Sequence, residues 1–125
     1  MIQYNNEIVD ILNEIFVKED EYVESVLLAS HGMVLQFVSL SIDCQERVFA
    51  NILGERYEWN DAPNSGPWGS LARQMAKRAS LKSPDLLRID FDSGDYVEIE
   101  TVESEYESVI FEFLPKNDAL VMQIY

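Results

Sequence analysis

The residues best suited to chemistry in this sequence are carboxylates in its C-terminal half. Asp90, Asp92 and Asp95 follow one another closely, and Glu98 and Glu100 come next. Paired carboxylates can hydrolyse glycosides, and acidic loops can bind calcium. Acids are so frequent in this chain that some pair will lie at a suitable distance by chance, and the segment lacks the spacing and terminal glutamate of an EF-hand. A hairpin turn explains it better, so we predict no catalytic residue, no metal and no cofactor.

The other reactive side chains are one cysteine and one histidine, Cys44 and His31. A cysteine and a histidine can form a nucleophilic pair. However, His31 lies beside Gly32 in a predicted turn, and Cys44 follows a predicted strand. We expect a turn residue and a small apolar residue, respectively. The sequence contains no zinc-binding spacing, phosphate-binding loop, dinucleotide-binding fingerprint or nucleophile elbow.

Alternation along residues 86–125 separates an apolar face from a face that mixes acids with tyrosines. The apolar face holds Leu87, Ile89, Phe91, Val97, Ile99, Val109, Phe111, Phe113, Leu120, Met122 and Ile124. The opposite face holds Arg88, Asp90, Tyr96, Glu98, Glu100, Tyr106, Ser108, Ile110, Glu112, Val121, Gln123 and Tyr125. Acids on neighbouring strands repel one another unless a cation offsets them. Two interpretations stay open, an ordinary solvated face or a surface that docks a basic protein.

A second acidic and aromatic cluster precedes this region. It consists of Glu55, Tyr57, Glu58, Trp59 and Asp61. The cluster can extend the docking surface, or it can be a loop whose Trp59 and Tyr57 fold back onto the core. Both interpretations stay open.

The elements that must position these residues follow from periodicity. Apolar residues at helical spacing predict helices over Asn6 to Lys18 and from Trp68 to Ala79, the second stopped by Pro84. Strands are predicted over residues 23–29, 33–42, 47–53, 86–91, 96–102, 106–114 and 119–125, with a short extended piece running into a loop over 55–66. This order predicts a single α+β domain over residues 1–125, with an antiparallel sheet of about six or seven strands and two amphipathic helices.

The composition is strongly acidic. The 125 residues carry 23 Asp+Glu against 9 Lys+Arg, a formal net charge of −14. Residues 1–61 and 85–125 each carry −9, whereas residues 62–84 carry +4. Such a surface repels nucleic acid and anionic lipid and attracts cationic partners. The unpaired cysteine, together with an acidic, helical opening where a signal peptide would be basic and then apolar, leads us to expect the reducing cytoplasm.

A family resemblance covers about residues 85–125. The run from Leu87 to Ile99, with glycine in its turn, is followed by Tyr106-Glu107. It resembles the pattern of small bacterial immunity proteins, including those of contact-dependent growth inhibition and other polymorphic toxin systems. The resemblance implies an antitoxin that binds a toxin domain, typically a nuclease, and blocks its active site.

The leading hypothesis is therefore a cytoplasmic, non-enzymatic immunity protein that neutralises a basic toxin. Its predicted partner-binding residues are Asp90, Asp92, Tyr96, Glu98, Glu100 and Tyr106, then Glu58 and Trp59. Reversal of Glu98 and Glu100 to lysine is predicted to weaken binding by several kcal/mol with little loss of fold stability. The alternative is an adaptor or subunit that assembles through a helix face bearing Arg73, Lys77 and Arg78, or through a sheet edge. A small hydrolase is a third hypothesis.

Overall fold

Strands dominate the computed structural model of this chain. It describes residues 4–18, 20–29, 32–59, 67–101, 109–116 and 119–125, and between 114 and 124 it describes only the backbone. Within these ranges lie one α-helix, one short 3-10 helix and ten strands. Their bounds are α1 Asn6–Lys18, β1 Val23–Leu28, β2 Met33–Phe37, β3 Leu40–Cys44, β4 Val48–Ile52, β5 Glu55–Trp59, η1 Trp68–Leu71, β6 Ala76–Ser83, β7 Leu86–Phe91, β8 Tyr96–Glu100, β9 Val109–Lys116 and β10 Ala119–Ile124.

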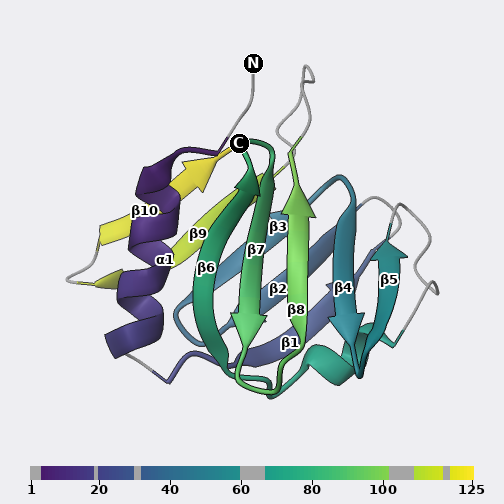
Figure 1. Ribbon diagram of the computed structural model, residues 1–125. Helices are drawn as coiled ribbons and strands as arrows, with labels where there is room; N and C mark the ends of the chain where they lie inside the picture. Colours follow the sequence, from purple (N-terminus) through teal and green to yellow (C-terminus); the bar gives the residue numbers. More distant parts are fainter. Residues whose placement is uncertain (1–3, 19, 30–31, 60–66, 102–108, 117–118) are drawn as a thin grey trace.

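The strands form two antiparallel sheets that pack face to face (Figure 1). One sheet has the order β1-β2-β3-β9-β10 and the other the order β5-β4-β8-β7-β6. In Figure 1 the strands of the rear sheet run obliquely across those of the front sheet. At one corner the sheets are joined by the backbone, because Val23 donates to the Gln74 carbonyl (3.0 Å) and Ala76 donates to the Glu21 carbonyl (2.8 Å).

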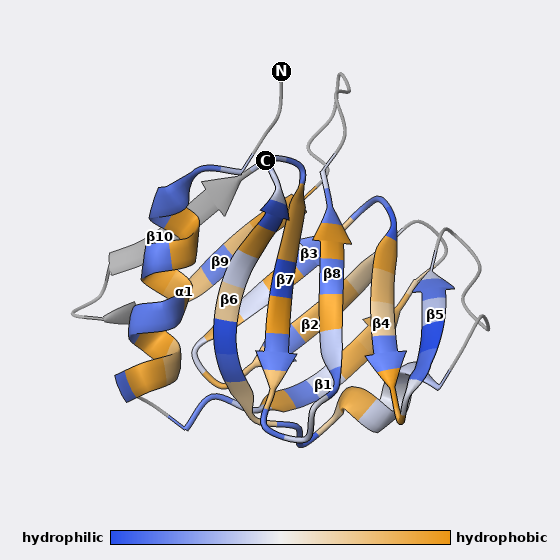
Figure 2. Ribbon diagram, in the orientation of Figure 1, coloured by the Kyte–Doolittle hydropathy of each residue, from blue (hydrophilic) through white to orange (hydrophobic). Residues whose placement is uncertain are grey.

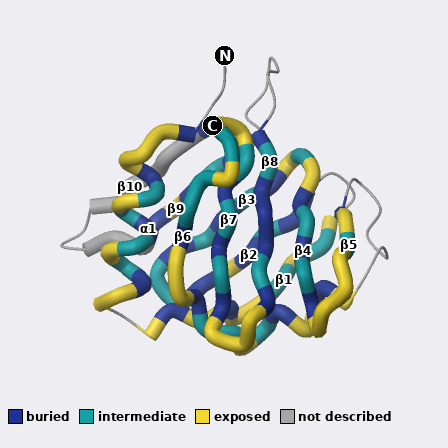
Figure 3. The backbone as a smooth tube through the Cα atoms, viewed as in Figure 1, coloured by how far each residue is buried: buried dark blue, intermediate teal, exposed yellow. Residues whose placement is uncertain are grey.

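The core lies between the two sheets. Along the front strands apolar and polar residues alternate (Figure 2), and buried and more exposed positions alternate with them (Figure 3). The inward residues of β7 and β8, such as Leu87, Ile89 and Val97, are completely buried. The apolar face predicted for these two strands is confirmed, as is the antiparallel α+β class.

The predicted helix over Asn6–Lys18 is confirmed as α1. Asn5 caps it by accepting a hydrogen bond from the Ile8 N–H at 3.2 Å. Its buried residues are Ile8, Leu12 and Phe16, which close the side of the sandwich. The spacing of these residues makes one apolar stripe, and burial of that stripe supplies most of the stability of such a helix.

The predicted helix from Trp68 to Ala79 is wrong. After η1 the chain turns at Arg73 and continues as strand β6, which pairs with β7. The register shifts between Ala76 and Arg78 and again between Leu81 and Ser83. Such a bulge inserts one extra residue, so Ala76 and Ala79, three positions apart, are both buried. The bulged strand therefore imitates the apolar spacing of a helix, and the helix face assigned to Arg73, Lys77 and Arg78 does not form.

The single sheet expected for the C-terminal strands is also wrong. β7 and β8 belong to the front sheet, whereas β9 pairs with β3 in the rear sheet, with Phe113 opposite Leu40. The segment predicted as one strand over residues 33–42 is divided into β2 and β3. Because the sheets pack core to core, the outward face of β7 and β8 points away from that of β9. Tyr125, assigned to the acidic face, is instead buried against Tyr4, with ring centroids 5.2 Å apart.

The free edge of β6 is covered by α1. The Asn13 side-chain amide donates to the Ala79 carbonyl at 2.9 Å and accepts from the Ala79 N–H at 2.8 Å. One side chain thus replaces the pair of hydrogen bonds that a neighbouring strand would make, which protects an edge that could otherwise pair with another chain.

Replacing Asn13 with alanine is expected to lower the free energy of unfolding by about 1.5 kcal/mol, because two backbone groups lose their partner. Chemical denaturation checks this. Asn13→Asp should lose stability as well, since its carboxylate still accepts from the Ala79 N–H but sets a second oxygen against the Ala79 carbonyl. Equal stability of Asn13→Ala and the unchanged protein would contradict this role of the helix.

Candidate functional site

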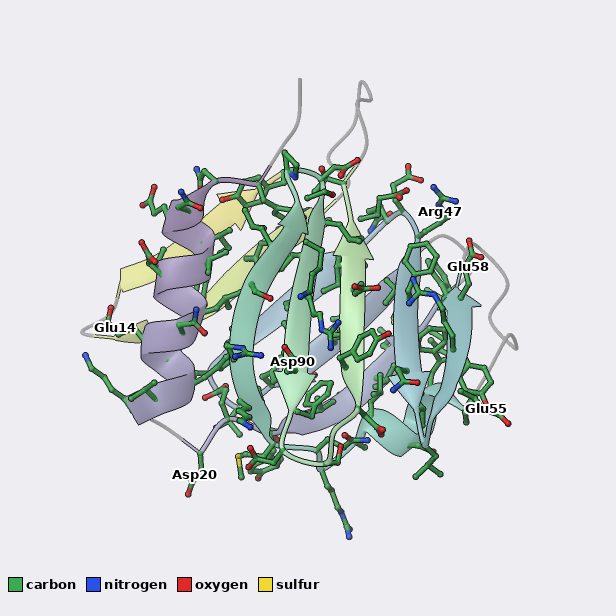
Figure 4. All side chains as sticks on the ribbon, viewed as in Figure 1. Glu14, Asp20, Arg47, Glu55, Glu58 and Asp90 are labelled. Carbon is green, nitrogen blue, oxygen red and sulfur yellow. The ribbon has the colours of Figure 1, made fainter. Side chains whose placement is uncertain are left out.

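The outward face of the front sheet carries a continuous row of arginines, carboxylates and aromatic rings (Figure 4). We call it the outer charged row. Its members come from β4 to β8 and the residue before β4, and they are Arg47, Phe49, Arg56, Glu58, Arg78, Arg88, Asp90, Tyr96, Glu98 and Glu100.

At one end of the row Arg47 binds two glutamates. Its Nε and Nη2 atoms donate to the two carboxylate oxygens of Glu100, both at 3.0 Å. Glu58 lies 3.8 Å from Arg47 Nη1. The hydrogen bond with Glu100 raises the pKa of the Arg47 guanidinium, so this cation is held in its charged form. The forked geometry suits a guanidinium and a carboxylate in one plane.

In the middle of the row Arg56 lies over the Phe49 ring, 4.6 Å from its centroid. Its Nη2 atom is 3.1 Å from a carboxylate oxygen of Glu98. Its Nη1 atom donates to the Tyr96 hydroxyl at 3.4 Å. Glu98 is only 7% exposed, so Arg56 covers it and compensates its charge.

At the other end Arg88 stacks on the Tyr96 ring. Its guanidinium carbon is 3.7 Å from the Tyr96 ring centroid. Arg88 Nε donates to Asp90 at 3.0 Å, and Arg78 Nη2 lies 3.6 Å from the other oxygen of Asp90. Arg88 and Arg78 thus offset this carboxylate together.

The row is electrically balanced. Its four arginines offset its four carboxylates, so all of the acids predicted to face a partner except Asp92 already have cations from their own chain. This is the compensation that acids on neighbouring strands require. Stacking of arginine on aromatic rings adds to the ion pairs. The row therefore stabilises the sheet surface and leaves little acidic charge there for a partner.

The predicted site residues fall into separate places. Asp90, Tyr96, Glu98 and Glu100 lie together in the row, and Glu58 lies at its margin, exposed. Asp92 is exposed in the β7–β8 turn. Trp59 is only 1% exposed and faces the core, which matches the alternative in which it folds back. Tyr106 lies outside the described residues.

Sequence reasoning missed a polar cluster at the end of the sandwich where two hairpins turn. Asp95 is 6% exposed. One of its oxygens accepts the Leu53 backbone N–H at 3.0 Å, and the other accepts the Gln74 side-chain amide at 2.8 Å. The Ser93 hydroxyl donates to the side-chain amide oxygen of Gln74 at 2.6 Å. We call these four residues the turn cluster.

The turn cluster connects three segments distant in sequence. The β7–β8 turn was predicted correctly, and Gly94 has the positive φ of +95° that such a turn needs. The burial of Asp95 was not predictable from that turn. Its partners come from the β4–β5 hairpin and from the segment before β6, and only the folded structure brings them together.

The remaining candidates for chemistry give no reactive centre within the described ranges. Cys44 is buried, and burial together with the Asp43 charge raises the pKa of its thiol, which keeps it protonated and unreactive. His31 lies outside the described residues. Where side chains are described, no group of three or more histidines, cysteines, aspartates and glutamates is arranged to hold a metal. None of the described helices has the length and apolarity needed to span a membrane.

Comparison of the chain with models of known protein families, with curated proteins and with solved structures finds no match.

Proposed function

We propose that this domain is an immunity-type inhibitor that binds and neutralises a basic toxin domain, and that it acts in the cytoplasm. The observation that supports the proposal is an excess of surface acids outside the outer charged row. In the described part of the chain these acids have no lysine or arginine within ion-pair distance. They are Glu7, Asp10, Asp20, Glu24, Asp43, Glu46, Glu55, Asp85, Asp92 and Glu112.

This distribution favours a cationic partner for a physical reason. Carboxylates already paired with arginine contribute little to the field around a protein, whereas unpaired ones sum to a potential that attracts positive charge. Nucleases must hold phosphates and therefore present basic grooves. An acidic protein that occupies such a groove blocks the substrate and associates rapidly.

The predicted partner-binding residues differ in how far they are exposed. Asp92 presents an exposed carboxylate outside the row, and Glu58 is exposed at the margin of the row, 3.8 Å from Arg47. Asp90, Glu98 and Glu100 are half-buried or buried beneath their arginines, so they position the row rather than meet a partner directly. Of the two surfaces considered for a non-enzymatic assembly subunit, the helix face does not form, and the sheet edge stays an alternative.

Co-expression tests the proposal. The polypeptide encoded immediately upstream is produced alone and together with this protein, in cells whose growth is followed, and the pair is purified at low and at high salt. We expect the upstream polypeptide to be toxic alone, harmless with this protein, and bound one to one, with weaker binding at high salt because the charges are screened.

Two results would contradict the proposal. One is growth that is unaffected by either combination. The other is a stable homo-oligomer, seen by light scattering, that binds no basic protein at either salt concentration. The second result would favour the assembly subunit.

A further inference from the structure

Leu53 occupies an unusual position at the tip of the β4–β5 hairpin. Ile52 and Glu55 are paired across the hairpin, so Leu53 and Gly54 form a two-residue turn. Both have positive φ, +54° and +85°. This turn normally takes asparagine, aspartate or glycine, because a larger side chain is strained at positive φ.

Burial of the Leu53 side chain does not compensate this backbone strain. It is 88% exposed, so it buries almost no apolar area. A Cβ added at the neighbouring Gly54 would meet no atom within 4 Å, which shows that the tip projects into open space. The residue thus combines backbone strain with an exposed apolar side chain, and neither stabilises the monomer.

The backbone of the tip is nevertheless held by a side-chain hydrogen bond. The Leu53 N–H is bound by Asp95, and Asp95 is in turn bound by Gln74. A buried carboxylate is an expensive group to place under a surface turn, yet here it fixes the backbone of the one strained leucine. Rigid presentation of an apolar side chain lowers the entropic cost of docking it.

Val17 is exposed nearly as much as Leu53 but lacks its positive φ. It is 83% exposed, but it lies in the last turn of α1, in ordinary helical backbone. Single exposed apolar residues of this kind are normal on soluble domains. Val17 therefore serves as a matched control for Leu53.

The charges beside the tip indicate what it meets. Glu55 begins β5 at the hairpin end (Figure 4), and Asp92 lies in the turn that also contains Asp95. Arg56, the cation nearest the tip along the chain, is paired with Glu98 at 3.1 Å. Glu55 and Asp92 are exposed and have no lysine or arginine within ion-pair distance in the described structure, so the charge beside the tip that no cation offsets is acidic.

We infer that Leu53 is an anchor that inserts into an apolar pocket with a basic rim on the partner protein. This inference rests on the proposed function for the positive charge of the partner, and it adds the contact point. The acids around the tip meet the basic rim, while the leucine fills the pocket. A few side chains buried in pockets of the partner supply most of the binding energy of an interface.

Site-specific crosslinking tests the anchor. A photoreactive diazirine analogue of leucine is placed at position 53, and in a control protein at position 17, in the cells that naturally produce the chain. We expect a discrete adduct with a basic protein from position 53 and none from position 17. No discrete adduct at position 53, equal adducts at both positions, or an adduct with a second copy of the chain would each overturn the inference.

The captured protein is then purified and titrated with three forms of the domain. Leu53→Asn should melt at the same or a higher temperature, because asparagine suits positive φ, and should bind at least tenfold more weakly. Val17→Asn should bind like the unchanged domain. Binding of Leu53→Asn within twofold of the unchanged domain overturns the anchor.

The two proposals fail in different ways. A captured basic protein that is harmless to cells, but that loses binding with Leu53→Asn, supports the anchor and contradicts the toxin inhibitor. A toxin that is neutralised equally well by Leu53→Asn supports the inhibitor and overturns the anchor.

Discussion

Replacing Asp95 with alanine is expected to lower the free energy of unfolding by about 3 kcal/mol, since hydrogen bonds to a charged group are worth more than neutral ones. The substitution removes the acceptor of both the Leu53 N–H and the Gln74 side-chain amide. Both groups would then need new partners at the end of the sandwich. Urea denaturation followed by tryptophan fluorescence measures the loss.

Two further variants separate the contributions within the turn cluster. Asp95→Asn keeps one acceptor oxygen and should lose about half as much stability, whereas Gln74→Ala should lose less because the Leu53 contact is kept. If Asp95→Ala is as stable as the unchanged protein, the turn cluster is not what holds the two hairpins together.

The second large effect is expected at Glu98. Replacement of Glu98 with lysine should cost about 2 kcal/mol of folding free energy, because it places a second cation against Arg56 where a covered carboxylate had compensated it. The ion pair of 3.1 Å becomes a repulsion beside the Tyr96 ring. This revises the prediction made from the sequence, in which the reversal affected binding and left the fold almost unchanged.

A charge swap tests whether the pair itself is responsible. The double variant Glu98→Lys with Arg56→Glu should recover a good part of the loss, as an interaction energy in a double-mutant cycle. Glu112→Lys is the matched control, because this exposed acid lies on the outward face of the other sheet without a cation nearby in the described structure. A loss as large in Glu112→Lys would attribute the effect to net charge instead of to the row.

Much of the fold follows from local patterns. The apolar stripe of α1 predicts a helix because side chains three and four positions apart share one face. Alternation along β7 and β8 predicts strands with Leu87 and Ile89 inward, because successive side chains in a strand point to opposite faces. Both predictions are confirmed, since each depends only on the geometry of one element.

Other features were beyond the sequence because they depend on pairing between distant segments. Helical spacing from Trp68 to Ala79 is also produced by a strand with bulges, and only pairing with β7 decides between them. The division of the last four strands between two sheets has the same cause, since β9 pairs with β3 and not with β8, the strand before it in the chain.

In the candidate site, too, local patterns predicted the faces of the strands but not the pairing between distant residues. The carboxylates of β7 and β8 were correctly predicted to share one outward face. The arginines that pair with them were not predicted. Arg47 and Glu100 are 53 positions apart, and Arg56 and Tyr96 are 40 apart. No local pattern reports such a pairing.

The sequence by itself determined the acidic character of this protein, its antiparallel α+β class and the inward and outward faces of its best strands, because composition and periodicity act residue by residue. Only the tertiary structure decided which acids are neutralised, which lie free at the surface, and that Asp95 fixes a strained and exposed Leu53. These properties depend on distances between residues far apart in the chain, and those distances exist only once the two sheets have packed.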